Sequence, residues 1–570
     1  MIIDDLMTKS MYLFVILTMM GGASADLDNY TALKYIYNGT AINNTLINGD
    51  LDLCKLGRDN LDGIIIQGCR IEGNFNMSGI HLKSKADFSN TTFNGTVKFE
   101  ADLFDDDAVF NETAFCSNVT FKNSKFANIH CKNSSFIGRK ADFSNVSFSG
   151  SANFINAQFR GAVNFIDVQF HGATDFSGAQ FLGATDFSNT QLVEAYFSKS
   201  IFYRKAVFFN VSFSGNAEFE NAQFKEGTEF KKVNFLGSIC SFSNAFFGRY
   251  ISFHLVNSKG SMYFDNTKFI KKLEFFDSII SDKTYFSNAI FGFEVVFNNC
   301  TFNIIDFYNC TFENTALFSK NIFDDNLDFS QSEFEKDTSF KFSTFNGDAI
   351  FKNTNFKGNI SFFSAKLKGM TDFRGASLSG PIANFSWVEF SGDTFMDNIS
   401  FAKNSSLILD DSKIARLDIE WNQIKDHLEY DGSTYLALIK NFRELEKFED
   451  ADNCYFSYRW NKMIDPSRDR LLKFLDIISL LSCGYGVYLS ITIVLGILMM
   501  LIFALWFLRF EWSLDAVLFS IIIFSQAPRS EKYSNMMKRH EYAVILEQLL
   551  GWCLMALFMV VLTKKLIIMS

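Results

Sequence analysis

This chain of 570 residues contains few prolines and few histidines, and its acidic residues outnumber its basic residues. Only 3 prolines occur, so neither a proline-rich linker nor a disordered proline-rich tail is expected. The net charge is −10, which argues against a surface for the phosphates of nucleic acid. Nucleic acid is therefore not expected as a partner.

Motifs for catalysis and metal binding are also missing. The 6 histidines are scattered, and there is no His-Glu-x-x-His, no Cys-x-x-Cys, no nucleophile elbow and no phosphate-binding glycine loop. Acidic runs occur at residues 105–107 and 324–325, where solvated corners are the simplest interpretation. We therefore predict that the protein is not an enzyme and that it has no catalytic residue, no cofactor and no metal site.

Phenylalanine, by contrast, is abundant, with 70 residues. From Phe143 to Phe187 it recurs at steps of five and six, with a small residue two positions earlier, as in Ala152 and Phe154. A helix would space apolar residues three and four apart, whereas a spacing of two puts both on one side of an extended segment. No such pair can bury its ring alone, so the pairs must coil and stack into one core. The polar residues between them should face solvent: Asn153, Gln158, Asn164 and Asp175.

Three segments resemble the pentapeptide-repeat family: Ala-Asp-Phe-Ser-Asn at 141–145, Ala-Asn-Phe at 152–154 and Thr-Asp-Phe-Ser-Gly at 174–178. The resemblance implies a right-handed, quadrilateral β-helix with the Phe and the small residue pointing inward. Because every second unit is stretched, each coil should take about 22 residues. The pattern covers residues 71–417, which gives roughly sixteen coils and a rod about 75 Å long at ~4.8 Å per coil.

The N-terminus has the layout of a secretory signal peptide. Lys9 precedes a short apolar run at 11–20, and an Ala-x-Ala site ends at Ala25. An uncleaved anchor is the alternative. Export would permit glycosylation of Asn-x-Ser/Thr sequons, although β-helix corners favour the same residues. The glycosylation candidates are Asn38, Asn76, Asn90, Asn94, Asn111, Asn118, Asn133, Asn145 and Asn210.

Eight of the 10 cysteines fall into two groups. One group takes the small inward position before a Phe or lies in an apolar helix, and we expect it to be buried: Cys240, Cys300, Cys310 and Cys553. The other group contains the disulfide candidates, which the sequence cannot pair: Cys54, Cys69, Cys116 and Cys131.

The Phe pattern ends near Leu417, and residues 435–445 change to helical spacing after a start signal at 431–434. A second helix is expected over 452–462, ending before Pro466. Basic residues then precede a long apolar run and would suit an anionic lipid surface: Arg459, Lys462, Arg468, Arg470 and Lys473.

Residues 487–508 and 543–562 are each long enough to cross a hydrocarbon core of ~30 Å, whereas 512–525 is apolar but too short. This layout resembles the two-helix pore-loop ion channels, with 518–525 similar to a pore helix and 547–552 to the start of an inner helix. The resemblance implies a homotetramer. Potassium selectivity is not implied, because 525–530 contains no glycine for a carbonyl filter. The pore-loop candidates are Ser525, Gln526, Ala527, Pro528, Arg529, Glu547 and Gly551.

Two features of this region have alternative interpretations. Glu547 either faces the interior of a bundle, where carboxylates within spans usually lie, or sits at the membrane interface. Gly484-Tyr485-Gly486 looks like a filter, but it precedes the first span and is better explained as a bend.

The sequence therefore predicts a signal peptide at 1–25, an N-terminal cap region at 26–70, the β-helix at 71–417, an amphipathic helical linker at 418–482 and a two-span, pore-loop-like membrane domain at 483–570. Two functions compete. One is a membrane-anchored surface protein whose β-helix is a rigid binding or scaffold rod, and the other is a nonselective or ligand-gated channel with the rod as sensing or assembly domain. Expected partners are the lipid bilayer, further copies of the chain, and an extracellular protein or glycan. An intracellular DNA mimic is a weaker alternative, because the rod is expected outside the cell.

Overall fold

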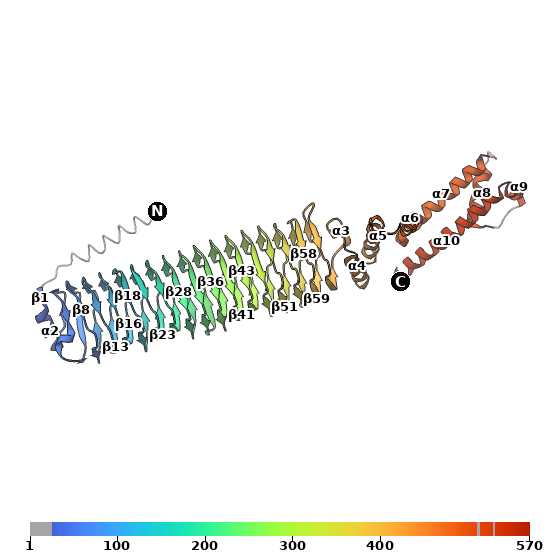
Figure 1. Ribbon diagram of the computed structural model, residues 1–570. Coiled ribbons are helices and arrows are strands. Elements are labelled where there is room, and N and C mark those ends of the chain that lie inside the picture. Colours follow the sequence, from blue (N-terminus) through green and yellow to red (C-terminus); the bar gives the residue numbers. More distant parts are fainter. Residues whose placement is uncertain (1–25, 510–513, 528–530, 570) are drawn as a thin grey trace. The chain divides into compact units, whose positions relative to one another are not determined.

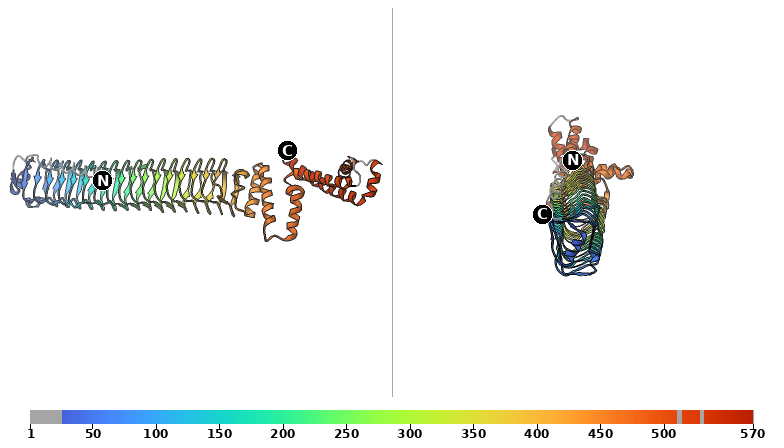
Figure 2. Two further views of the ribbon diagram at one scale, coloured as in Figure 1. Left: turned by 90° about the horizontal axis from the view of Figure 1, so that it is seen from above. Right: turned by 90° about the vertical axis from the view of Figure 1, so that its left-hand side faces the viewer.

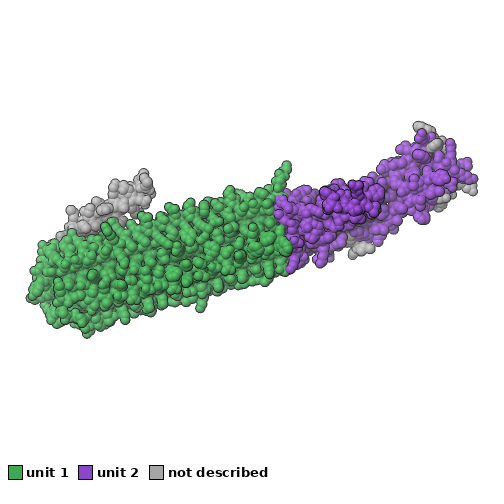
Figure 3. Space-filling view, in the orientation of Figure 1, with its two compact units in different colours: residues 1–405 green, residues 406–570 purple. Residues whose placement is uncertain are grey.

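The structure, a computed structural model, describes residues 26–509, 514–527 and 531–569. The chain forms two compact units, residues 1–405 and 406–570 (Figure 3). The predicted signal peptide and the pore-loop candidates Pro528 and Arg529 lie outside the described residues.

The first unit is a parallel β-solenoid with short strands on the four sides of each coil. In one coil these are β20 (Ala152–Asn153), β21 (Gln158–Phe159), β22 (Ala162–Asn164) and the start of β23 (Gln169–Asp175). Each strand pairs with its counterpart in the next coil, as Gln158 does with Gln180, 22 residues later. Figure 1 shows the stacked strands, and the end-on view in Figure 2 shows the coils superimposed. The predicted fold class and coil length are confirmed.

The solenoid has more coils than the pattern suggested. One of its sides is an 18-stranded sheet, against the roughly sixteen coils expected. Parallel pairing starts at β1 (Asp26–Asp28), within the range assigned to a cap region. The helix α2 (Asn29–Tyr37) starts at Asp28, whose carboxylate accepts a hydrogen bond from the Thr31 backbone N–H, and it buries Ala32 and Ile36 against the first strands.

Columns of Phe rings fill the solenoid. Phe154, Phe176 and Phe197 follow one another in successive coils, with centroids 4.8 and 5.0 Å apart and interplanar angles of 7° and 11°. Rings on adjoining sides meet edge to face, as Phe176 and Phe187 do at 81°. The ring spacing matches the ~4.8 Å between strands, so rings that follow one another in a column are in close contact. Each ring pair contributes about 0.5–1.5 kcal/mol beyond its buried area.

The residue before each Phe explains why Asn and Asp dominate the outside. Asp175 Oδ1 accepts a hydrogen bond from the Ser177 backbone N–H at 2.8 Å, which starts the corner. Corners also need a left-handed residue, such as Asn145 with φ +57°. The Asn145 side-chain amide donates to Asn123 of the previous coil at 2.9 Å. Polar corner residues therefore build a ladder along the rod.

A second polar ladder is buried between the coils. Ser124 Oγ donates to the Phe99 carbonyl at 2.7 Å, and Thr190 Oγ1 donates to the Phe165 carbonyl at 2.7 Å. These hydroxyls satisfy backbone groups that the corners leave unpaired.

The second unit is mainly helical. Two strands, β61 (Ser406–Ile408) and β62 (Lys413–Asp418), precede its helices. The helices are α3 (Trp421–Ile424), α4 (Gly432–Glu444), α5 (Phe448–Ile464), α6 (Arg470–Cys483), α7 (Leu489–Leu508), α8 (Leu514–Ser525), α9 (Ser534–Arg539) and α10 (Glu541–Met569).

The helix α4 covers the edge of β62. Asn441 both donates to the Leu417 carbonyl at 2.7 Å and accepts from the Leu417 N–H at 2.9 Å, and Lys447 contacts Asp418 at 2.5 Å. An open strand edge would otherwise be a site for further pairing. Part of the predicted linker therefore caps the last strand of its unit.

α7 and α10 are long and apolar enough to cross a membrane, by length and composition. They correspond to the spans predicted at 487–508 and 543–562. α8, with 12 residues, is the short apolar helix between them.

The cysteines correct part of the sequence analysis. Cys240, Cys300 and Cys310 are buried as expected, but Cys553 is exposed on the surface of α10. None of the four disulfide candidates is paired: Cys54, Cys69, Cys116 and Cys131 are free. Cys131 takes an inward position before Ser134, which donates to its carbonyl, so it acts as a small core residue.

Candidate functional site

One side of the solenoid presents tyrosine rings among carboxylates. Tyr263 and Tyr285 pair on successive coils and stack with centroids 5.2 Å apart. Asp306 pairs with Tyr285 on the next coil, and Asp265 lies two residues after Tyr263. Burial raises the pKa of both carboxyls. Flat rings beside hydrogen-bonding groups are suited to binding an extended glycan or a polar peptide.

Asp102 is an exception in the buried hydroxyl ladder. Its Oδ1 accepts from the Ile80 N–H at 2.8 Å, but Oδ2 is buried without a partner. Asn321 occupies the same kind of position, accepting from the Cys300 N–H at 2.9 Å and donating to the Phe297 carbonyl at 2.8 Å. An ionised Asp cannot make the second bond, and burial raises the Asp102 pKa to about 8. We infer a structural role for this carboxyl.

In the second unit, α8 packs against both long helices. A Cβ on Gly551 of α10 would lie 2.8 Å from the Phe524 carbonyl oxygen, and one on Gly496 of α7 would lie 3.3 Å from the Phe524 ring. Small residues permit this close approach of helices. Phe507 of α7 and Phe519 of α8 are buried together in a hydrophobic cluster. Of the pore-loop candidates, Gly551 therefore has a packing role.

Glu547 is fully buried inside this bundle, so it faces the interior rather than an interface. Its Oε1 contacts the hydroxyl of Ser520 on α8, and Ser520 Oγ lies 2.8 Å from the Met500 carbonyl oxygen on α7. A serine hydroxyl has one hydrogen, and a carbonyl oxygen only accepts. Both contacts are hydrogen bonds if Ser520 donates to Met500 and a protonated Glu547 donates to Ser520. The geometry therefore favours a neutral Glu547 that links three helices.

The remaining pore-loop candidates lie away from Glu547. Ser525 is exposed at the end of α8, where its hydroxyl donates to the Ile521 carbonyl at 2.6 Å. Gln526 follows with φ +55° and is exposed, and Ala527 ends the described segment. The structure brings Glu547 and Gly551 together along one face of α10, four residues apart, and leaves Ser525 and Gln526 outside that contact.

Gly484, Tyr485 and Gly486 form a turn between α6 and α7. Their φ angles are +53°, +58° and +77°, so three consecutive residues are left-handed. Glycine adopts this conformation at low cost, and Tyr485 is held in it by burial against Phe456. The segment is therefore a bend and not a filter, which agrees with the preferred interpretation of the sequence.

Asp476 of α6 is a site that the sequence analysis missed. It is buried and contacts both Arg459 and Arg468, the latter at 2.7 Å. Burial acts to raise its pKa, but hydrogen bonds from the two guanidiniums outweigh this and hold the pKa below its usual range. The two arginines, predicted to face lipid, instead neutralise this carboxylate. The sequence feature that could have indicated this site is a single Asp within an apolar helical run.

A second ion-pair cluster links the end of α10 to α5 and to the turn before α7. Lys564 and Lys565 near the end of α10 lie 3.2 and 3.9 Å from the Asp452 carboxylate on α5. Lys564 also donates to the Gly486 carbonyl just before α7, at 3.4 Å. The start of α7 and the end of α10 therefore meet, so the two helices form a hairpin.

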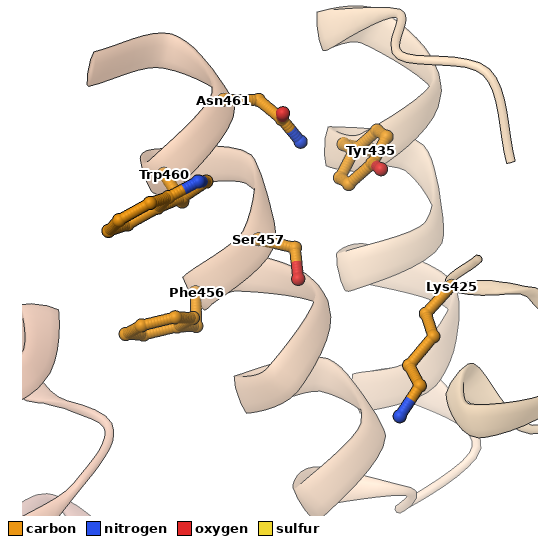
Figure 4. Close-up of a pocket in the computed structure, with 6 residues that line it drawn as sticks. All are labelled: Lys425, Tyr435, Phe456, Ser457, Trp460 and Asn461. Atoms are coloured by element: carbon orange, nitrogen blue, oxygen red, sulfur yellow. The ribbon is translucent and has the colours of Figure 1, made fainter. Parts of the chain in front are cut away.

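Beside α5 lies a shallow cavity of about 320 Å³. In Figure 4, Ser457 and Asn461 of α5 point toward Tyr435 of α4. The other lining residues are Lys425, Phe456 and Trp460. This set lacks paired acid and base groups for catalysis. Across the described ranges, no group of three or more His, Cys, Asp or Glu side chains could hold a metal ion.

The glycosylation candidates differ in accessibility. Asn76, Asn94 and Asn111 are half-buried, and Asn145 and Asn210 donate their amides along the corner ladder. Asn133 accepts from the Asn156 amide. Six candidates are exposed: Asn38, Asn90, Asn118, Asn133, Asn145 and Asn210.

Residues 132–180 and 165–208 match the family model for pentapeptide repeats, described as 9 copies. The solenoid thus contains pentapeptide repeats, and the match lies wholly within it. Comparison with curated proteins and with solved structures gave no match.

Proposed function

We propose that the chain is a membrane-anchored surface protein in which a pentapeptide-repeat solenoid serves as a rigid binding or scaffold rod. The observation that carries this proposal is the apolar outer surface of the α7–α10 hairpin. On α7, Val494, Leu501 and Leu505 are between 51% and 66% exposed, and α10 exposes Trp552 and Val560 at 61% and 67%. Core helices of a soluble unit would bury such residues, whereas a bilayer covers them.

The rod suits binding rather than catalysis. Its stacked Phe columns fix each coil on the next, so outward residues recur at a constant spacing. The surface around Tyr263 and Tyr285 is the best candidate for contact with an extracellular protein or glycan. No cofactor takes part in this proposal.

The rod is placed outside the cell because the first 25 residues have the layout of a signal peptide. Cys54 provides a direct test, since it is exposed on an early coil of the rod. A membrane-impermeant maleimide applied to intact cells should label a Cys116→Ser, Cys553→Ser variant through Cys54, and should leave the same variant with Cys54→Ser added unlabelled. Labelling only after permeabilisation would place the rod inside and refute this localisation. Enzymatic deglycosylation of the same sample should lower the mass, and the exposed candidates are Asn38, Asn90, Asn118, Asn133, Asn145 and Asn210.

A channel is the second candidate function. The observation in its favour is Glu547, a carboxyl buried between the long helices, together with a short helix between two spans. A channel of this layout would be a homotetramer. Purified chain in liposomes should then carry ions, with Glu547→Gln altering conductance or pH dependence. Absence of flux at every voltage, with monomers in detergent, would exclude this function and leave the scaffold proposal intact.

A further inference from the structure

The helix α6 is amphipathic with the usual orientation reversed. Its inward side carries Asp476 and Cys483, which are buried, and Lys473 and Ser479, which are half-buried. Its outward side consists of large apolar residues that are 43–66% exposed. These are Leu471, Leu472, Phe474, Leu475, Ile477, Ile478 and Leu481. A helix of a water-soluble unit turns such a face toward the core, so this one requires an apolar environment outside the protein.

The position of α6 along the chain identifies that environment. Gly486 ends the turn after α6 and lies three residues before α7, the first proposed span. With 14 residues, α6 is too short to cross a bilayer. Its inward side is fixed by the contacts of Asp476 with Arg459 of α5 and with Arg468 of the segment between α5 and α6, and these charges are costly to place in hydrocarbon. The helix is therefore located where headgroups meet acyl chains.

A groove between α6 and α7 supports the same conclusion. Leu481 of α6 and Ile491, Val494 and Leu498 of α7 line a cavity of about 280 Å³ that is open to the outside. Its walls are almost entirely aliphatic, which suits an acyl chain. Trp460 on α5 and Tyr488 at the start of α7 are partly exposed nearby, the residue types enriched at membrane interfaces.

We propose that α6 is an interfacial helix that lies parallel to the membrane plane, with its exposed apolar side chains in the acyl-chain boundary of the bilayer. The proposal rests on the membrane anchoring proposed above. In this arrangement α6 sets the depth of the hairpin and couples the membrane to the helices that follow the rod, through Asp476 and its two arginines.

Spin-label depth measurements on the full chain in lipid nanodiscs test this arrangement. Exposed native thiols are removed by Cys54→Ser, Cys116→Ser and Cys553→Ser, and nitroxides are attached to Phe474→Cys and Leu481→Cys. Both labels should be several-fold more accessible to oxygen than to a nickel chelate, and at equal depth. If α6 instead entered the bilayer end-on, their depths would differ by about 10 Å, seven residues at ~1.5 Å each.

The controls separate this inference from the anchoring proposal. A label at Ile497→Cys on α7 should be deep, and one at Gln191→Cys on the rod should be nickel-accessible. Nickel-accessible labels on α6 with a deep label at Ile497 would overturn the interfacial helix but leave the anchor. Labels on α6 shielded from both reagents would overturn it in favour of a second protein surface. A nickel-accessible label at Ile497 would refute the anchor itself.

Discussion

In the solenoid, Phe rings are inside and Asn, Asp and Ser line the outside, whereas from α6 onward the carboxyls of Asp476 and Glu547 are inside and leucines line the outside. Both units largely follow the same rule, that buried polar groups need partners and apolar surface needs an apolar neighbour; Asp102 Oδ2 in the rod and Glu547 Oε2 in the helical unit are exceptions. The difference lies in the environment each unit faces. The first is built for water, and we infer that the second is built for lipid.

The comparison also shows how each unit uses polar residues. In the rod, hydroxyls and amides such as Ser124 and Asn321 connect one coil to the next. In the helical unit, Ser520 and Glu547 connect separate helices. A polar group is thus a link between repeats in one unit and between long segments in the other.

The largest expected effect comes from a ring in the solenoid core. Phe219 stacks on Phe197 and Phe242 at 4.7 Å each, so Phe219→Ala should cost about 3–5 kcal/mol through lost burial and a cavity. Because coils contact only their neighbours, hydrogen exchange should rise in the adjacent coils and remain unchanged in α7 and α10. Gln191→Ala, on the outside, is the control. Exchange that rises equally along the whole rod would contradict this local coupling.

The next largest effect is expected from a charge placed on the outer surface, which the rod should tolerate and α7 should not. Leu498, half-exposed near the middle of α7, should disfavour membrane insertion by roughly 3–4 kcal/mol when changed to Asp. The matched change Gln191→Asp on the rod should have no effect on stability or on membrane association. The measurement is the fraction of chain in the membrane pellet. Equal tolerance of Leu498→Asp and Gln191→Asp would mean that α7 faces water.

Asp102 should give the rod a stability that depends on pH. Its folded-state pKa is about 8 against an ordinary value of 3.8, so the folded state binds the proton more tightly than the unfolded chain. The contribution is complete below about pH 4 and is lost as the pH rises toward 8. Asp102→Asn should remove this slope and stabilise the rod at neutral pH by roughly 1–3 kcal/mol. Denaturant titrations at pH 5 and 8 measure this pH dependence of stability. An unchanged slope in Asp102→Asn would mean that another group causes it.

The smallest effect is expected at Glu547. Since the geometry favours a protonated carboxyl, Glu547→Gln should keep a donor to Ser520 and change thermal stability in detergent by less than about 1 kcal/mol. Glu547→Ala should cost more, because Ser520 then loses a donor and a cavity forms. A large loss with Gln, equal to that with Ala, would indicate that wild-type Glu547 is ionised.

The rod was largely predictable from local spacing. Pairs such as Ala152 and Phe154 can be buried together only in an extended, stacked chain, and they are 1% and 0% exposed. The number of coils was underestimated because the first coils use Ile and Leu in place of Phe, as in Ile42 and Leu61. The core of these first coils nevertheless accepts any large apolar side chain in place of Phe.

The helical unit was less predictable. Span lengths follow from composition, but which helix faces which depends on contacts between distant residues, such as Asp452 with Lys564 and Ser520 with Glu547. Arg459 and Arg468 could not be assigned to Asp476 from spacing alone, because the pairs join α5, α6 and the segment between them. Two of the disulfide candidates, Cys69 and Cys131, are buried because the core of a solenoid accepts a small thiol at an inward position, whereas Cys54 is exposed and Cys116 is half-buried.

Membrane anchoring through α7 and α10 can be tested by alkaline carbonate extraction of membranes from cells that produce the full chain. We expect the chain to remain in the membrane pellet with its rod folded, so that Cys54 still reacts while Cys240 and Cys310 stay protected. Release of a folded chain into the supernatant would contradict it, because the exposed residues of α6, α7 and α10 would then be covered by protein and not by lipid.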